Sequence, residues 1–125
     1  MILGTGIDAC EVERISSSIA KFGDRFLERI FTPAEIIYCK SKRNFAERFA
    51  ARFAAKEAAM KALGTGQSRG VFWTSIEVGR EPGGRPALKL HDAAARIAAA
   101  AGVKRMSLSL THTSTQAIAM VIFED

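Results

Sequence analysis

Several features that define common protein classes are missing from this 125-residue sequence. Its longest apolar runs are too short to span a bilayer, so a transmembrane helix is excluded. Residues Met1 to Asp8 show no basic segment and no cleavage pattern, so we expect a cytoplasmic protein. There is no repeat, low-complexity segment or interdomain linker. The length therefore fits a single domain over residues 1–125.

Cysteine is scarce, and it points to no metal centre. Cys10 and Cys39 are the only two cysteines, and neither has metal-type spacing or a histidine at a usable distance along the chain. That excludes a common zinc site and leaves two free thiols that serve as packing residues. A Walker A loop is also missing, because Gly64-Thr65-Gly66 follows a helical pattern and does not open a helix with lysine and serine or threonine.

Charge and hydropathy indicate a folded protein with an acidic partner. Hydrophobic residues make up 48% of the chain, the formal net charge is +5 and the pI is near 9.6. Nucleic acid, a phosphorylated cofactor and an acidic protein all suit such a charge. No known nucleic-acid motif is present, but a small basic binding module without catalysis remains the alternative to an enzyme at this point.

The strongest single pattern is an alanine-rich, proline-free helix from Arg48 toward Gly66. At about 100° per residue, Phe49, Phe53 and Met60 share one face, and Glu57 lies on that face with them. Gly64 stands where the apolar pattern ends, as a helix C-terminal cap does.

A carboxylate on an apolar stripe needs a favourable partner. For Glu57 that partner could be a metal ion, a neighbouring cation, or solvent at the rim of the stripe. Arg52 and Lys56 flank it, and Lys61 lies four residues on. The simpler alternative is an ordinary surface pair between Glu57 and Lys61.

The first half of the chain predicts one strand and three further helical segments. Residues 2–7 are predicted to form a strand that ends at Asp8, with glycines at 4 and 6 that let another backbone or a ligand approach closely. A helix follows with Val12 and Ile15 on its apolar side, and Asp8 with Glu11 has capping-box spacing, which is the structural alternative for Asp8. A helical stripe at residues 22, 26 and 30 comes next. Thr32-Pro33-Ala34-Glu35 is a strong helix start, with a capping threonine and proline at the first position.

The second half predicts hairpins around one helix. Residues 72–78 alternate as a strand, residues 79–86 form a turn, and residues 87–90 return as the second arm. Asp92 would cap an alanine-rich helix to Ala101, stopped by Gly102. Residues 106–111 and 116–123 are the last two strands. Because helices cluster between the strands, we predict an α+β fold: a mainly antiparallel sheet packed with one long central helix and shorter helices.

Three polar residues occupy positions where apolar side chains would pack better. They are Asp8 at a strand end, Glu57 on the central helix and His112 at the end of an alternating strand. Two carboxylates from separate elements suit Mg²⁺, which leaves its other positions to water and phosphate oxygens. Lys61, Arg85 and His112 could bind phosphates, and the Gly64–Gly66 turn offers backbone for a flat ring.

At this point four motifs, in order, resemble the holo-[acyl-carrier-protein] synthases. They are Gly6-Ile7-Asp8 with Glu11-Val12 and Arg14-Ile15; Arg52-Phe53 with Lys56-Glu57-Ala58 and Lys61-Ala62-Leu63-Gly64; Gly84-Arg85-Pro86; and Ser109-Leu110-Thr111-His112. Their spacing covers the whole chain. Leu110 stands where isoleucine is also common.

The resemblance implies a 4′-phosphopantetheinyl transferase. Such an enzyme moves phosphopantetheine from coenzyme A to a serine of acyl carrier protein and releases adenosine 3′,5′-bisphosphate. It further implies Mg²⁺ on Asp8 and Glu57, a cytoplasmic homotrimer with active sites between subunits, and no nucleic-acid or membrane partner.

The resemblance also assigns roles residue by residue. The catalytic set is Asp8, Glu57 and Lys61, with Lys61 stabilising charge on the departing phosphate. The acidic carrier protein would dock on Arg14, Arg25 and Arg29, although these arginines could also be plain solvated surface. The base for the serine hydroxyl stays open between Glu57 and a metal-bound water. Coenzyme A is expected against Arg52, Lys61, Gly64, Thr65, Gly66, Arg85, Pro86, Thr111 and His112.

Overall fold

A computed structural model describes all residues, 1–125, and divides the chain between two antiparallel sheets and five α-helices. The strands are β1 (Ile2–Glu11), β2 (Ile76–Arg80), β3 (Pro86–Leu90), β4 (Arg105–His112) and β5 (Gln116–Glu124). The helices are α1 (Val12–Phe22), α2 (Asp24–Ile30), α3 (Pro33–Lys40), α4 (Phe45–Leu63) and α5 (Asp92–Ala100), with a short 3₁₀ turn, η1, at Trp73–Ser75. The predicted α+β class is confirmed.

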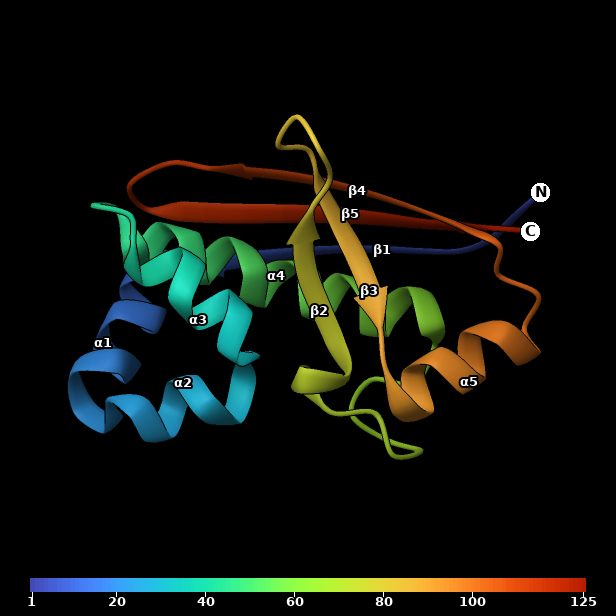
Figure 1. The fold of residues 1–125 in the computed structure, drawn as a ribbon, viewed down its shortest axis with the longest axis horizontal. Helices are drawn as coiled ribbons and strands as arrows, with labels where there is room; N and C mark the ends of the chain where they lie inside the picture. Colours follow the sequence, from blue (N-terminus) through green and yellow to red (C-terminus); the bar gives the residue numbers. More distant parts are fainter.

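The long helix α4 is the centre of the fold. The three-stranded sheet has the order β1-β5-β4, and α4 packs along it, while the β2–β3 hairpin lies against the other side of the helix (Figure 1). Helices α1 to α3 gather at one end and α5 at the other. Both termini lie together, since the Met1 ammonium is 2.7 Å from Asp125 Oδ1.

Alanine and glycine let the sheet approach α4 closely. Six alanines of the helix are fully buried: Ala50, Ala51, Ala54, Ala55, Ala58 and Ala59. A Cβ atom placed on Gly6 would come within 1.7 Å of the Ala58 carbonyl oxygen, and one on Gly4 within 2.2 Å of the Ala62 oxygen. No other residue type allows such an approach. The two glycines therefore fix the position of β1 over α4.

Most predicted elements are confirmed, with corrected ends. Gly64 caps α4 in the left-handed region (φ 77°), and Thr32 with Glu35 forms the predicted capping box. Strand β5 forms where predicted and buries every second residue, Ala117, Ala119, Val121 and Phe123, against the core.

Four local predictions were wrong. Asp8 does not end β1 or cap α1, because the strand continues to Glu11 and pairs Asp8 with Ala119. The helical stripe through residue 22 is broken at Gly23, which leaves Phe22 exposed. Residues 73–75 form η1, so strand β2 begins only at Ile76. Asp92 is not a cap: His91 takes the N-cap position and no side chain makes a cap hydrogen bond.

Candidate active site

The candidate catalytic residues lie where β1 crosses α4. Gly4 faces Ala62 and Gly6 faces Ala58, so β1 and α4 run in opposite directions where they cross. Two strand residues span about 6.6 Å and four helix residues about 6 Å. Asp8, the next residue on that side of β1, is therefore carried toward the turn of α4 that bears Glu57.

Lys61 completes this group, but it pairs with Asp8 and not with Glu57. Its Nζ lies 3.2 Å from Asp8 Oδ1 and donates to the Ile7 carbonyl oxygen at 2.9 Å. The predicted alternative of a Glu57–Lys61 surface pair is therefore wrong. The Asp8 side chain is 19% exposed and that of Lys61 55%, so this ion pair stands at the edge of solvent.

Glu57 lies at the rim of the buried stripe, and its partner is an indole. Its Oε1 accepts a hydrogen bond from Trp73 Nε1 at 3.0 Å. The prediction that Glu57 occupies the apolar face needs correction, because Lys56 occupies the centre of that face. Phe49, Lys56 and Met60 are at most 1% exposed, whereas Phe53 and Glu57 are half-buried.

The charge of buried Lys56 is met by groups from three elements. Its Nζ is 2.7 Å from Glu35 Oε1 and also donates to the carbonyl oxygens of Trp73 and Ile76. Burial lowers the pKa of Lys56, and the Glu35 carboxylate opposes that change. Glu35 in turn accepts the Val78 N–H at 2.8 Å. This ion pair therefore attaches η1 and β2 to α4.

The carboxylates of Asp8 and Glu57 both lie close enough to Cys10 to affect the pKa of its thiol. Burial raises the pKa of the Cys10 thiol to about 11, Arg14 opposes that rise, and the charges of Asp8, Glu11 and Glu57 add to it. Neither Asp8 Oδ2 nor Glu57 Oε2 takes part in a hydrogen bond within the chain. Each carboxylate thus keeps an oxygen available.

These two oxygens fit Mg²⁺ better than a metal that needs a full protein cage. No cluster of three or more histidine, cysteine, aspartate or glutamate side chains able to hold a metal exists in the chain. Mg²⁺ is commonly held by one or two carboxylates, with water and phosphate oxygens supplying the rest. The Asp8 carboxylate already faces one cation, the Lys61 ammonium.

A second group of predicted residues surrounds a basic hollow. Arg52, Pro86 and His112 line it together with Arg48 and Arg80. The buried Arg52 places its guanidinium 4.5 Å from the centre of the Tyr38 ring, and its Nε is the only buried side-chain polar atom without a hydrogen-bond partner. A hollow with three guanidinium groups suits phosphate oxygens.

His112 is held at the edge of this hollow by a carboxylate. Its Nδ1 lies 3.0 Å from Glu47 Oε1, which leaves Nε2 for another group. Thr111, in contrast, is exposed on the other face of the sheet, opposite Ile118. Arg85 lines a separate open hollow between β3 and β4. No hydrogen bond or ion pair joins these residues to Asp8 or Glu57.

The Gly64–Gly66 turn lies where the prediction placed it, next in the chain after the helical turn of Lys61. Gly64 and Gly66 both have positive φ, 77° and 56°, and Thr65 between them is buried. Nothing lies within 4 Å of a Cβ added at either glycine, so backbone is open to a ligand there.

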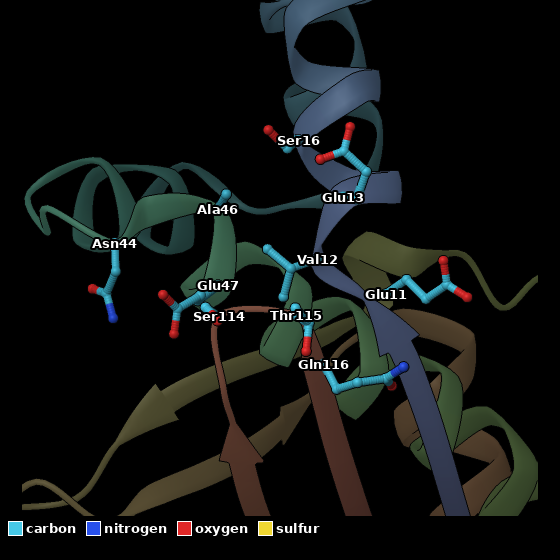
Figure 2. Close-up of a pocket in the computed structure, with 10 residues that line it drawn as sticks. All are labelled: Glu11, Val12, Glu13, Ser16, Asn44, Ala46, Glu47, Ser114, Thr115 and Gln116. Atoms are coloured by element: carbon cyan, nitrogen blue, oxygen red, sulfur yellow. The ribbon is translucent and has the colours of Figure 1, made fainter.

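Another hollow has the wrong charge for a phosphorylated ligand. Figure 2 shows Glu11 and Glu13 near the start of α1 and Glu47 near the start of α4 around one cavity, with Ser114 and its neighbours closing it. Three carboxylates would repel a diphosphate. Cations that would attract an anionic substrate lie instead at the basic hollow and at Lys61.

The predicted docking arginines lie on one side of the molecule. Arg14 and Arg29 line a hollow with Phe26, Phe53 and Trp73, and Arg25 lines an adjoining one with Arg29. Cations around apolar side chains are what an acidic, amphipathic helix would require.

Several residues of the site were missed from the sequence. Lys56 was treated only as a neighbour of Glu57, although its spacing from Phe49 and Met60 places it on the same stripe. Trp73 and Tyr38 carried no sequence signal, because each acts through contacts with residues far along the chain.

Comparison with known proteins places this chain in a family. The profile of the 4′-phosphopantetheinyl transferase superfamily matches residues 4–121. The chain belongs to the 4′-phosphopantetheinyl transferase superfamily. Within it, the chain is 64% identical to the holo-[acyl-carrier-protein] synthase of Koribacter versatilis and 54% identical to that of Solibacter usitatus, with all of each chain covered.

Solved structures agree. The holo-[acyl-carrier-protein] synthase of Neisseria meningitidis superposes with a TM-score of 0.91 at 34% identity, covering 100% of both chains. The Bacillus anthracis synthase, solved in complex with coenzyme A (3′,5′-ADP), gives a TM-score of 0.81 at 35% identity and covers 98% of this chain and 96% of its own. The predicted family is confirmed. Separately, no helix of the chain has the length and apolarity to cross a membrane.

Proposed function

We propose that this chain transfers 4′-phosphopantetheine from coenzyme A to a serine of apo acyl carrier protein, in a reaction that depends on Mg²⁺. The observation that carries the proposal is the grouping of Asp8, Glu57 and Lys61 at the crossing of β1 and α4. Family membership supplies the reaction class. A binding module without catalysis offers no reason for this grouping.

Asp8 and Glu57 would hold the ion through their available oxygens, which belong to two different elements. When bound, Mg²⁺ screens the diphosphate and polarises the phosphorus under attack. The Lys61 ammonium lies 3.2 Å from Asp8 Oδ1, beside the expected ion, and would stabilise the charge on the departing phosphate. The Gly64–Gly66 turn and Thr65, which follow Lys61, would receive the nucleotide part of coenzyme A.

Arg52, Arg85, Pro86, Thr111 and His112 would bind coenzyme A from a second subunit. For Thr111 the reason is that its side chain lies on the exposed face of the sheet, away from Asp8 and Glu57; for the other four it is that no hydrogen bond or ion pair joins them to either carboxylate. The same face carries Ile7, Ile118 and Met120, which are 62%, 40% and 44% exposed. Such an apolar sheet face favours burial against another copy, as a homotrimer would provide.

Arg14, Arg25 and Arg29 would dock the acidic carrier protein beside the catalytic group. Phe53 links the two regions, because it lies one helical turn before Glu57 and lines the same hollow as Arg14 and Arg29. The cytoplasmic location expected from the sequence stays a prediction.

The test is incubation of the chain with coenzyme A, Mg²⁺ and apo acyl carrier protein, followed by intact-mass analysis of the carrier protein. We expect a gain of one phosphopantetheine, lost on chelation of the metal and reduced by a factor of about 10² or more in Asp8→Ala and Glu57→Ala. Lys104→Ala, an exposed substitution away from the site, is the control and should keep full activity. A wild-type reaction without mass gain refutes the proposal.

A further inference from the structure

The indole of Trp73 touches both the Glu57 carboxylate and the side of the molecule where the arginines gather. Its Nε1 donates to Glu57 Oε1 at 3.0 Å. Its ring stacks on Phe53, with 6.2 Å between ring centres and 28° between planes. The Arg29 guanidinium lies 5.9 Å from the ring centre, a cation–π distance.

The main chain of residue 73 is held as well as its side chain. Buried Lys56 donates to the Trp73 carbonyl oxygen at 3.1 Å. Lys56 and Glu57 are neighbours on α4, so consecutive residues of one helix hold Trp73, one by its carbonyl and the other by its indole. Lys56 is itself held by Glu35 at 2.7 Å. The indole therefore has little freedom to leave the Glu57 carboxylate.

One oxygen of Glu57 is occupied by this bond, and the other is left available. A partner of this kind sets the rotamer of a carboxylate and selects the oxygen that faces a ligand. Because an indole N–H can only donate, the Glu57 oxygen that it contacts is the acceptor of this bond. These contacts therefore hold the Trp73 indole and the Glu57 carboxylate against each other.

We propose that Trp73 is the positioning residue of the active site: its N–H orients Glu57 for the metal ion, and its ring joins Glu57 to Arg29 on the carrier-protein side. The role of Glu57 as a metal ligand rests on the proposed function. The fixation of its carboxylate by Trp73 is a property of this chain alone.

Two substitutions separate the two contacts of the indole. Trp73→Phe removes the N–H but keeps a ring against Phe53 and Arg29. We expect the Mg²⁺ concentration for half-maximal rate to rise about tenfold, the usual effect of losing a carboxylate's outer partner, with an unchanged KM for apo acyl carrier protein. Trp73→Leu removes the ring as well, and we expect KM for the carrier protein to rise too.

Phe72→Leu is the matched control. It removes an aromatic ring from the adjacent residue, which is 65% exposed and touches none of these groups. It should change neither parameter. A purely structural role of Trp73 would shift the Mg²⁺ dependence and the carrier KM together in both Trp73 variants, and that result would overturn the proposal.

Trp73 is also the only tryptophan in the chain, so its fluorescence reports on this contact directly. We expect MgCl₂, added with coenzyme A but without carrier protein, to shift the emission of the wild-type chain and not that of Glu57→Ala. If the wild-type chain transfers phosphopantetheine while its emission ignores Mg²⁺, the positioning role is wrong and the proposed function stands. If the chain transfers nothing, the proposed function fails first.

Discussion

At the scale of single residues, the two thiols are the simplest to test. Cys10 and Cys39 are 3% and 0% exposed, and burial raises the pKa of each to about 11. Both are therefore neutral thiols near pH 8. Because the thiolate is the nucleophile, they should react slowly at that pH.

We expect a thiol reagent such as 5,5′-dithiobis(2-nitrobenzoate) to label the folded chain at pH 8 far more slowly than the chain in 6 M guanidinium chloride. The labelling rate of the folded chain should rise as the pH approaches 11, provided that the fold persists, which circular dichroism checks. Rapid labelling of two thiols in the folded chain at pH 8 would show that these positions are not closed.

Residue identity in the site was predictable in part. Asp8 and Glu57 were selected from the sequence because a polar residue at a strand end or on an apolar stripe needs a reason, and Lys61 because it lies four residues after Glu57. Their pairing was not predictable: Lys61 contacts Asp8 across 53 positions and Glu57 contacts Trp73 across 16. A helical wheel contains only neighbours along one helix, so it favoured a pair that does not form.

At the scale of elements, the contact between β1 and α4 positions Asp8. It depends on Gly6, where a Cβ atom would come within 1.7 Å of the Ala58 carbonyl oxygen, part of a helix main chain that cannot give way. The strand would have to move off the helix, and Asp8 with it.

We expect Gly6→Ala to lower the free energy of unfolding by about 3 kcal/mol, the upper part of the range for overpacked sites, and to reduce transfer with it. Urea denaturation gives the free energy. Gly79→Ala is the control, because nothing lies within 4 Å of a Cβ there and its φ is not in the left-handed region. An equal effect of the two substitutions would mean that the close approach of β1 is unimportant.

Elements with their own local signals were predicted best. The capping box at Thr32 and the glycine cap at Gly64 act within a few residues, so the sequence contains them completely. The start of β2 was misplaced because alternation at residues 72–75 resembles a strand, whereas the Lys56 contacts to Trp73 and Ile76 hold that segment as a turn. Those contacts involve another element, and no local pattern announces them.

At the scale of the whole molecule, the net charge of +5 should steer an acidic partner, and Arg14 lies at the hollow where we expect it to dock. Charge reversal by Arg14→Glu should raise KM for acyl carrier protein by about tenfold, or about 1.4 kcal/mol, with little change in KM for coenzyme A. Steady-state kinetics on both substrates measures this. Lys104→Glu makes the same charge change on a distant exposed residue. An equal rise in KM for acyl carrier protein there would mean that net charge, and not docking at Arg14, causes the effect.

The exposed sheet face provides the test of assembly. Met120 is 44% exposed and lies opposite Ile7 and Ser109 in the sheet. If this face is buried in a homotrimer, Met120→Lys should reduce the mass measured by light scattering to that of smaller species and lower transfer, because Thr111 would be lost from the neighbouring site. Ile37→Lys, at a residue 72% exposed on α3, should leave mass and rate unchanged. A monomeric, active wild-type chain would contradict the shared site.

The most direct measurement is a crystal structure of the chain grown with coenzyme A and Mn²⁺, the latter located by anomalous scattering. We expect one ion bound directly by an oxygen of Asp8 and an oxygen of Glu57, and in contact with the diphosphate. An ion bound elsewhere, or bound by only one of these carboxylates, would contradict it.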